Sequence, residues 1–145
     1  MREIREITSS ETYIVRNPVL RPGKPVETCR FEGDDLTSTT HFGLYENGEL
    51  AGVASLFQSK HPAFPDFRQF QLRGMAVLEE FQRRSFGREL LEAAEDKARR
   101  AAAEVVWFNA REVAVGFYER MGYKLTGKPF QIGEIGTHYV MFKRM

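Results

Sequence analysis

The sequence predicts a mixed α/β fold in which helices flank one sheet, and three observations predict it. Two segments of alternating polarity flank Asn47-Gly48, and Asn-Gly between such segments is the strongest short signal for a β-hairpin. An apolar segment that ends at Val77 is followed by an amphipathic one, which is typical of a strand that leads into a helix. The run Glu104–Asn109 is short and almost continuously apolar, as in a strand buried inside a sheet.

The N-terminal part of the chain predicts a strand, a helix and a long loop. Glu3–Ile7 is predicted to form the first strand. Thr8 and Glu11 have the spacing of a capping box, so we expect a helix that opens there and runs to about Val19, where prolines limit it. Arg21–Thr40 contains proline, glycine and paired aspartates and predicts a loop.

The middle of the chain predicts the hairpin, a further strand and the longest helix. The hairpin strands are expected at His41–Tyr45 and Leu50–Phe57, and the next strand at Phe67–Val77. A helix is expected over Gly87–Ala103, because leucines and alanines recur on one stripe while the charged residues lie largely off it.

The C-terminal part follows the Glu104–Asn109 strand with a helix and two strands. The helix is expected at Arg111–Met121, and Gly122 supplies its stop. The two strands are expected at Tyr123–Leu125 and His138–Lys143. The order of elements therefore predicts a mixed α/β sheet.

Composition restricts the partners that the protein is expected to have. Its 145 residues fit one domain, 1–145, and the net charge of +1 provides no global field for nucleic acid or an anionic membrane. No apolar stretch is long enough to span a bilayer. A lone Cys29 excludes an internal disulfide and fits a loop or core thiol in the cytoplasm, where we expect the protein. Three scattered histidines and this cysteine lack metal-ligand spacing, so we expect no bound metal.

A basic loop, Gln82–Arg88, directly precedes the longest predicted helix. Its Gly87 lets a ligand approach the backbone closely, and the free N–H groups of the first helical turn favour an anion together with the helix dipole. Arg83, Arg84 and Arg88 add donors for charge-assisted hydrogen bonds. The loop therefore predicts a phosphate site, and a solvated basic turn is the alternative.

This loop resembles the acyl-CoA pyrophosphate loop of the GNAT superfamily of N-acetyltransferases. The family pattern Gln/Arg-x-x-Gly-x-Gly/Ala corresponds here to Gln82-x-x-Ser85-x-Gly87. The segment Gly74–Val77 resembles the end of the family's central strand, and Asn109–Tyr123 resembles its later strand–helix–strand unit with the FYE motif. The resemblance implies a GNAT-like fold, with a twisted, mixed and largely antiparallel sheet flanked by helices.

The resemblance also implies acetyl-CoA as the acyl donor and a set of contacts to it. Ser85 stands where the family usually has glycine, and a serine forced to positive φ would cost about 1–2 kcal/mol. Asn109 ends its predicted strand, where it could contact the cofactor or the acceptor, cap the following helix, or do both. The cofactor-binding residues that the resemblance implies are Met75, Ala76, Val77, Gln82, Arg83, Arg84, Ser85, Phe86, Gly87, Arg88, Asn109 and Phe117.

Two residues are expected to move protons during acetyl transfer. Tyr118 matches the family tyrosine that faces the sulfur of the cofactor, so the resemblance implies that it protonates the departing thiolate. The alternative for Tyr118 is a tyrosine that packs on the sheet. Some relatives carry a glutamate where this chain has Gln71, so the candidate bases are Glu79 and Glu80, of which we choose Glu80, acting directly or through water. The alternatives are that at least one of the two is only part of a solvated loop, and that a chain of water molecules suffices without a dedicated base.

Four residues are expected on the acceptor side: Arg21, His41, Arg73 and His138. Arg73 lies within an apolar strand, where it would hold an acidic group of the acceptor or point to solvent on the outer face. Each histidine begins a predicted strand, where it would face the acceptor cleft or solvent.

The expected function is transfer of an acetyl group from acetyl-CoA to a primary amine. Direct attack is expected, because no residues form a covalent-nucleophile constellation. The low net charge favours a small-molecule acceptor, with no nucleic-acid or membrane partner, and a homodimer is left open. A non-catalytic acyl-CoA sensor on the same fold is one alternative, motivated by Ser85 and Gln71. A module that binds nucleic acid or protein through the arginines of the loop is another.

Overall fold

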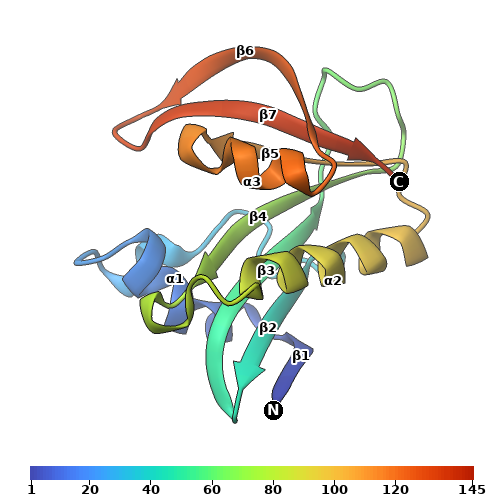
Figure 1. Cartoon of the computed structure of the whole chain (residues 1–145). Helices are drawn as coiled ribbons and strands as arrows, with labels where there is room; N and C mark the ends of the chain where they lie inside the picture. The colour runs from blue at the N-terminus through green and yellow to red at the C-terminus, as the bar shows by residue number, and fades with distance from the viewer. The chain divides into compact units, whose positions relative to one another are not determined.

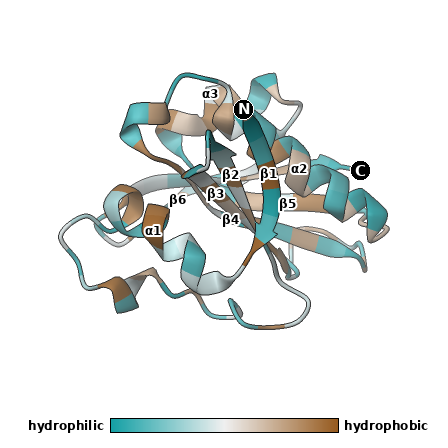
Figure 2. Cartoon of the chain, turned by 90° about the horizontal axis from the view of Figure 1, so that it is seen from below, coloured by the Kyte–Doolittle hydropathy of each residue, from teal (hydrophilic) through white to brown (hydrophobic).

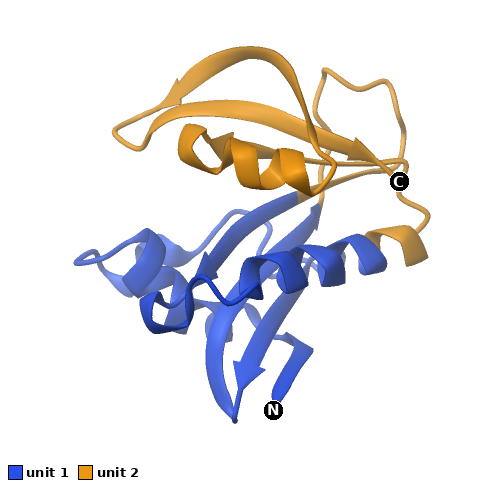
Figure 3. Ribbon diagram, viewed as in Figure 1, with its two compact units in different colours: residues 1–57, 72–97 blue, residues 58–71, 98–145 orange.

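The computed structural model describes all residues, 1–145, and the chain divides into two compact units (Figure 3). Unit 1 comprises Met1–Phe57 and Leu72–Lys97. Unit 2 comprises Gln58–Gln71 and Ala98–Met145. The expectation of a single domain over the whole chain stays a prediction.

Seven strands and three helices form the secondary structure, together with three 3₁₀ turns (Figure 1). The strands are β1 (Arg2–Ile7), β2 (Thr40–Glu46), β3 (Glu49–Gln58), β4 (Gln69–Val77), β5 (Val105–Arg111), β6 (Lys124–Ile132) and β7 (Gly136–Arg144). The helices are α1 (Ser9–Leu20), α2 (Phe86–Arg100) and α3 (Val115–Arg120). The 3₁₀ turns are η1 (Val26–Cys29), η2 (Glu79–Phe81) and η3 (Glu112–Ala114).

The strands follow the order β1-β2-β3-β4-β5-β7-β6, and β4 contributes residues to both units. β1 with β2, β2 with β3, β5 with β7 and β6 with β7 are antiparallel, whereas β4 and β5 are parallel. The predicted fold class, a mixed and largely antiparallel sheet with helices, is therefore confirmed. None of the helices combines the length and the apolar content needed to cross a membrane.

The predicted hairpin forms in unit 1. Asn47 and Gly48 have φ angles of 51° and 85°, the left-handed pair that a two-residue turn of type I′ requires. β2 and β3 pair from Thr40↔Leu56 to Glu46↔Glu49, with one irregularity between Leu44 and Tyr45. β1 adds to the other side of β2 as a largely charged edge strand, drawn mostly in the hydrophilic colour in Figure 2.

The predicted capping box opens α1. The Thr8 hydroxyl accepts from the Glu11 backbone N–H at 3.3 Å, and the Glu11 carboxylate accepts from the Thr8 N–H at 2.9 Å. The helix buries Val15, which belongs to a core cluster with Val53 and Ala76. The cap fixes where α1 begins, and the burial of Val15 places one face of the helix against the strands of unit 1.

Helix α2 ends three residues before the predicted boundary. Ala102 adopts a φ of 60°, and the N–H of Ala103 donates to the carbonyl of Ala98 at 2.9 Å, which is the hydrogen bond of a Schellman stop. Such a stop usually contains glycine, so this sequence of alanines did not reveal it. The predicted apolar stripe is buried at Leu90 and Leu91, and the ribbon of α2 alternates between hydrophilic and hydrophobic colours in Figure 2.

Unit 2 is built around β5. Gln69–Gln71 of β4 pairs in parallel with Val105–Trp107, and β7 pairs with the other side of β5. Phe64, Val105, Trp107 and Val140 form its core cluster, against which Phe130 and Phe142 pack.

The C-terminal elements differ in length from the prediction. The predicted helix over 111–121 is divided between η3 and the six-residue α3. Strands β6 and β7 are each nine residues long, which is longer than predicted. In β6, Gly127 and Pro129 interrupt the alternation of the sequence but do not end the strand. The pairing of β6 with β7 accommodates this interruption by a register shift between Thr126 and Phe130.

Candidate active site

The end of β4 and the loop that follows it are fixed to one another within unit 1. The Gln82 side-chain amide donates to the carbonyl of Val77 at 2.9 Å. The Leu78 N–H donates to the carbonyl of Ala51 at 2.8 Å, which attaches the strand end to β3. Gln82, predicted to contact the cofactor directly, therefore also holds the loop against the strand.

The basic loop has two left-handed residues immediately before α2. Arg83 has a φ of 65° and Ser85 a φ of 67°, although neither is glycine. Left-handed residues that alternate with others turn backbone N–H groups toward one side, which is how anion-binding nests form. The Ser85 carbonyl accepts from the Glu89 N–H at 3.1 Å, which is the first hydrogen bond of α2. The N–H groups that precede Glu89 in the helix, including that of Gly87, therefore have no intrahelical partner.

The cations of this loop are mostly exposed. Arg83, Arg84 and Arg88 all have exposed side chains, and the Arg88 guanidinium lies 3.7 Å from the Glu92 carboxylate. An exposed ion pair of this kind is weak, so it leaves Arg88 able to exchange for an anionic ligand. Phe86, in contrast, is buried, so its ring offers no exposed surface to a ligand.

Replacement of Ser85 by glycine is expected to stabilise the protein by about 0.5–1 kcal/mol. Relief of the left-handed φ gains about 1–2 kcal/mol, and the larger backbone entropy that glycine loses on folding costs about 0.5–1 kcal/mol. CoA affinity, measured by calorimetry, is expected to be unchanged or tighter. Ala102→Gly is the matched control, since Ala102 has a φ of 60° in the turn after α2. It should stabilise similarly and leave CoA binding unaltered. A clear loss of affinity in Ser85→Gly alone would mean that the hydroxyl itself contacts phosphate.

A buried ion pair that the sequence did not reveal lies beside β4 in unit 1. Arg16 on α1 and Asp34 on the 21–40 segment both have fully buried side chains, and Nη1 of Arg16 lies 2.7 Å from Oδ2 of Asp34. Arg16 also donates to the carbonyl of Cys29 at 2.8 Å and to the hydroxyl of Ser55 at 3.0 Å. Asp34 accepts in addition from the backbone N–H of Phe31 at 2.9 Å. The pair therefore holds the long segment against α1 and β3.

His41, predicted on the acceptor side, belongs to this buried network. Its Nδ1 lies 2.6 Å from the Ser55 hydroxyl, and its Nε2 lies 2.8 Å from the backbone carbonyl of Asp34. Both ring nitrogens already have partners, and the side chain is buried. Cys29 is buried as well, in agreement with the core thiol that the sequence indicated.

Arg73 is half-buried and feels the charges of this network. Its guanidinium carbon lies 4.4 Å from the ring centre of Phe31 and 5.5 Å from that of Phe57. Partial burial, and next the positive charge of Arg16, lower the pKa of Arg73 from its ordinary value, although an arginine remains cationic in proteins. Arg21, also predicted to bind the acceptor, donates from Nη1 to the carbonyl of Leu20 at 3.1 Å.

In unit 2, Tyr118 packs among other aromatic side chains. Its ring centre lies 4.3 Å from that of Phe108, 5.1 Å from that of Phe117 and 6.2 Å from that of Tyr123. Burial raises the pKa of Tyr118 to about 12. The phenol is therefore protonated at neutral pH and can donate a proton, as the predicted acid must.

The other predicted site residues of unit 2 lie on strands β5 and β7. Asn109 is exposed and pairs with Val140, and the 3₁₀ turn that follows β5 has Arg111 at its N-cap. The alternative prediction that Asn109 caps the following helix is therefore wrong, because the strand continues past it. His138 is buried, and its Nδ1 lies 2.8 Å from the carbonyl of Gly136.

Glu80, the candidate base, is exposed within η2, directly before the basic loop. Glu80 follows Val77 by only three residues, and both belong to unit 1. A base at this position would exchange its proton readily with water.

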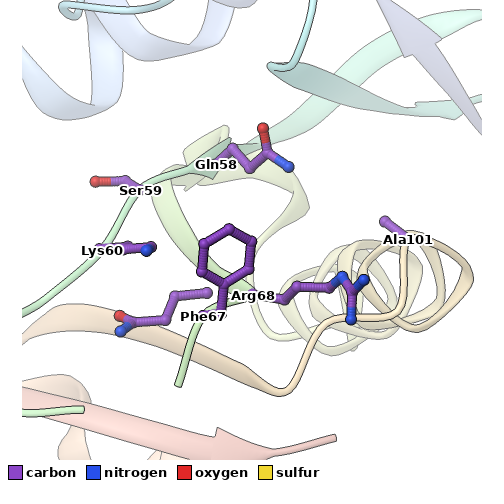
Figure 4. A pocket seen from close by; sticks show the side chains of 7 residues that line it. Gln58, Ser59, Lys60, Phe67, Arg68 and Ala101 are labelled. Atoms are coloured by element: carbon purple, nitrogen blue, oxygen red, sulfur yellow. The ribbon is translucent and has the colours of Figure 1, made fainter. Parts of the chain in front are cut away.

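Unit 2 also contains a pocket of about 340 Å³, in which Figure 4 shows the ring of Phe67 among polar side chains. Its lining residues are Gln58, Ser59, Lys60, Phe67, Arg68, Gln69 and Ala101. None of the site residues predicted from the sequence lines this pocket.

Comparison with known proteins identifies the family. The sequence profile of the Acetyltransferase (GNAT) family matches residues 1–123. YitI of Bacillus subtilis (strain 168), described as an uncharacterized N-acetyltransferase, is 34% identical over 145 residues, which cover 100% of this chain and 97% of YitI.

Solved structures share the fold at lower identity. Escherichia coli ElaA has a TM-score of 0.78 at 20% identity, over 99% of this chain and 100% of its own. A GNAT family acetyltransferase from Elizabethkingia anophelis, solved with acetyl-CoA bound, has a TM-score of 0.70 at 17% identity, over 99% of this chain and 98% of its own. With a family profile that matches most of its length and a relative that is similar from end to end, the chain belongs to the GNAT family of acetyltransferases and is an acyltransferase.

Proposed function

We propose that this acyltransferase uses acetyl-CoA as its donor and transfers the acetyl group to the primary amine of a small molecule. The observation that carries the proposal is the pair of left-handed residues, Arg83 and Ser85, directly before the N-terminus of α2. A backbone of this kind suits a pyrophosphate, and strain at non-glycine residues is commonly retained where it serves a ligand. The acetyl-CoA bound to the relative from Elizabethkingia anophelis supports the choice of donor.

The chemistry proposed for the site is a direct transfer. The amine nitrogen attacks the thioester carbonyl carbon, the carbon–sulfur bond breaks, and CoA leaves as a thiolate. Tyr118 supplies the proton that the thiolate takes up, and Glu80, directly or through water, accepts the proton that the amine loses. A backbone N–H at the Met75–Val77 end of β4 would face the thioester carbonyl, where a donor fixed in advance stabilises the oxyanion.

The remaining predicted residues are proposed to bind the two substrates. The backbone of Met75, Ala76 and Val77 would pair with the pantetheine arm, and the loop from Gln82 to Arg88 with the pyrophosphate. Asn109 and Phe117 are proposed on the cofactor. Arg21, Arg73 and His138 are proposed on the acceptor, whereas both nitrogens of His41 have structural partners, so it is proposed to support that side rather than to touch the ligand.

The proposal is tested by thiol release from acetyl-CoA over a panel of primary amines, with product identified by the mass of one added acetyl group. Turnover of a small amine, together with CoA binding measured by calorimetry, is the expected result. Tight CoA binding without turnover on any amine would favour the acyl-CoA sensor instead. Acetylation of peptides but of no small amine would overturn the acceptor class.

Localisation, oligomeric state and the nucleic-acid-binding alternative each have a separate test. Cytoplasmic localisation is proposed, and fractionation of cells that express the full chain would check it. A homodimer is left open, and light scattering at several protein concentrations would decide it. Salt-dependent binding to nucleic acid that free CoA does not displace would favour the nucleic-acid-binding alternative.

A further inference from the structure

Arg73 is a half-buried cation without an anionic partner. Phe31 and Phe57 contact its guanidinium, but no hydrogen bond or ion pair to another residue satisfies its donors. An arginine carries five N–H donors in a planar fork, and a buried charge is retained when something pairs with it. In the free protein, aromatic rings rather than an anion surround this group.

The nearby carboxylates are already used or exposed. Both oxygens of Asp34 accept from Arg16, at 2.7 Å from Nη1 and 3.2 Å from Nη2, and Oδ2 accepts from the Phe31 N–H as well. Glu32 has an exposed side chain, and both Asp34 and Glu32 attract Arg73 electrostatically without forming an ion pair with it. Asp34 therefore neutralises Arg16, and Arg73 remains as one excess positive charge.

A second donor beside Arg73 also lacks a partner. Nε of Arg16 is completely buried and makes no hydrogen bond. A Cβ on Gly74, the residue after Arg73, would lie 3.2 Å from this Nε and 2.8 Å from a ring carbon of Phe31. Gly74 has a φ of 66°, so a conformation that glycine adopts readily brings both guanidinium groups and the Phe31 ring to one point on β4.

The position of this point on β4 connects it to the proposed reaction. Arg73 precedes Met75 by two residues, and Met75–Val77 is the strand end proposed to hold the pantetheine arm and the thioester. A group bound at Arg73 would therefore lie a short distance along the same strand from the reacting carbonyl.

We propose that the amine acceptor carries a carboxylate, which pairs with the guanidinium of Arg73 between Phe31 and Phe57. This inference rests on the proposed acetyl transfer and names its acceptor class. A planar carboxylate matches the fork of an arginine bidentately, and its single charge balances the charge of Arg73. A phosphate, with a charge of about −1.5 to −2, would need Arg21 as well, whose positive charge also acts on Arg73, so phosphorylated amines are the competing class in the test. The aromatic rings exclude water and strengthen the pairing.

The test compares acceptor pairs that differ only in the charged group, an amino acid and its carboxamide, in wild type and in Arg73→Met. Wild type is expected to prefer the carboxylate about ten- to a hundredfold in kcat/KM, mainly through KM, which is the range for one charge-assisted pair. Arg73→Met should remove this preference by lowering kcat/KM for the carboxylate toward that for the carboxamide, and Arg73→Lys should restore part of it. Arg5→Met is the matched control, because Arg5 also stacks on a ring, at 3.8 Å from that of Tyr45, outside the site.

The outcomes separate this inference from the proposed function. Turnover of both members of each pair at equal kcat/KM would overturn the carboxylate site and leave acetyl transfer intact. A preference for phosphorylated amines over carboxylates would also overturn it. If no pair is turned over, the proposed function fails, and binding still decides the inference: carboxylates but not carboxamides should raise the Tm of the CoA-bound wild type and not that of Arg73→Met.

Discussion

Asp34→Asn is expected to destabilise the protein by about 3–5 kcal/mol, the cost of removing one partner from a buried ion pair. The substitution leaves the Arg16 guanidinium completely buried and without a counter-charge. It also weakens the acceptors for the N–H groups of Arg16 and Phe31, which hold the 21–40 segment in place. Urea denaturation followed by circular dichroism would measure the change.

The neighbouring aspartate provides a matched control. Asp35 pairs with Arg30 at 3.2 Å, but the two side chains are 59% and 69% exposed. Asp35→Asn is therefore expected to cost less than about 1 kcal/mol, as is usual for exposed pairs. Similar losses for the two variants would contradict the view that burial, rather than charge pairing alone, makes the Arg16–Asp34 contact important.

A double substitution tests the same account from the other direction. Because the desolvation of two charges offsets much of their attraction, Arg16→Met combined with Asp34→Leu should recover most of the stability that Asp34→Asn loses. The residual cost should come from Ser55 and the carbonyl of Cys29, which lose the donors that Arg16 provides, and from the Phe31 N–H, which loses the carboxylate acceptor. A double variant as unstable as Asp34→Asn would show that the network contributes more through its hydrogen bonds than through charge.

Local signals in the sequence predicted much of the fold. Asn47-Gly48 fixed the hairpin because few residues accept two successive left-handed conformations, and Thr8 with Glu11 marked the start of α1 because their side chains and backbone satisfy one another. The limits of α2 were less predictable. An alanine, Ala102, adopts the left-handed stop that glycine normally marks, and nothing in its side chain indicates this.

The buried network shows why part of the site could not be predicted. Thr12, Val15 and Arg16 are all buried, at the helical spacing i, i+3, i+4, so the position of Arg16 on the apolar stripe was the available signal. The partner of Arg16 could not be predicted, because Asp34 and Asp35 are adjacent in a loop and the sequence does not reveal which of the two side chains turns inward. The choice depends on the contact between Arg16 and Asp34, which are 18 residues apart in the chain.

Tyr118→Phe is expected to lower kcat by about 10²–10⁴-fold, the usual contribution of a general acid, while CoA affinity changes little. The substitution removes the hydroxyl but keeps the ring that packs at 4.3 Å from Phe108, so unit 2 should fold normally. Steady-state thiol release gives kcat, and calorimetry gives the affinity for CoA. Tyr139→Phe is the matched control, because the Tyr139 hydroxyl bonds to Glu112 and is not a proposed catalytic group.

The ionisation of Tyr118 distinguishes an acid from a packing residue that only positions its neighbours. Burial raises its pKa to about 12, above the ordinary value of about 10, so the folded protein holds this proton more tightly than the unfolded chain. The corresponding stability is fully present below about pH 10 and is lost as the pH rises toward about 12. Titration of tyrosinate absorbance should show one phenol near this value in wild type that is missing from Tyr118→Phe.

The same pKa makes a prediction for the rate. Because Tyr118 stays protonated up to about pH 11, its ionisation should produce no falling limb of kcat between about pH 7 and 10. If Tyr118→Phe keeps the wild-type kcat, or lowers it only as much as Tyr139→Phe does, then another group or water protonates the CoA thiolate. In that case the phenol serves only to pack against Phe108 and Tyr123, and the raised pKa reflects burial without catalysis.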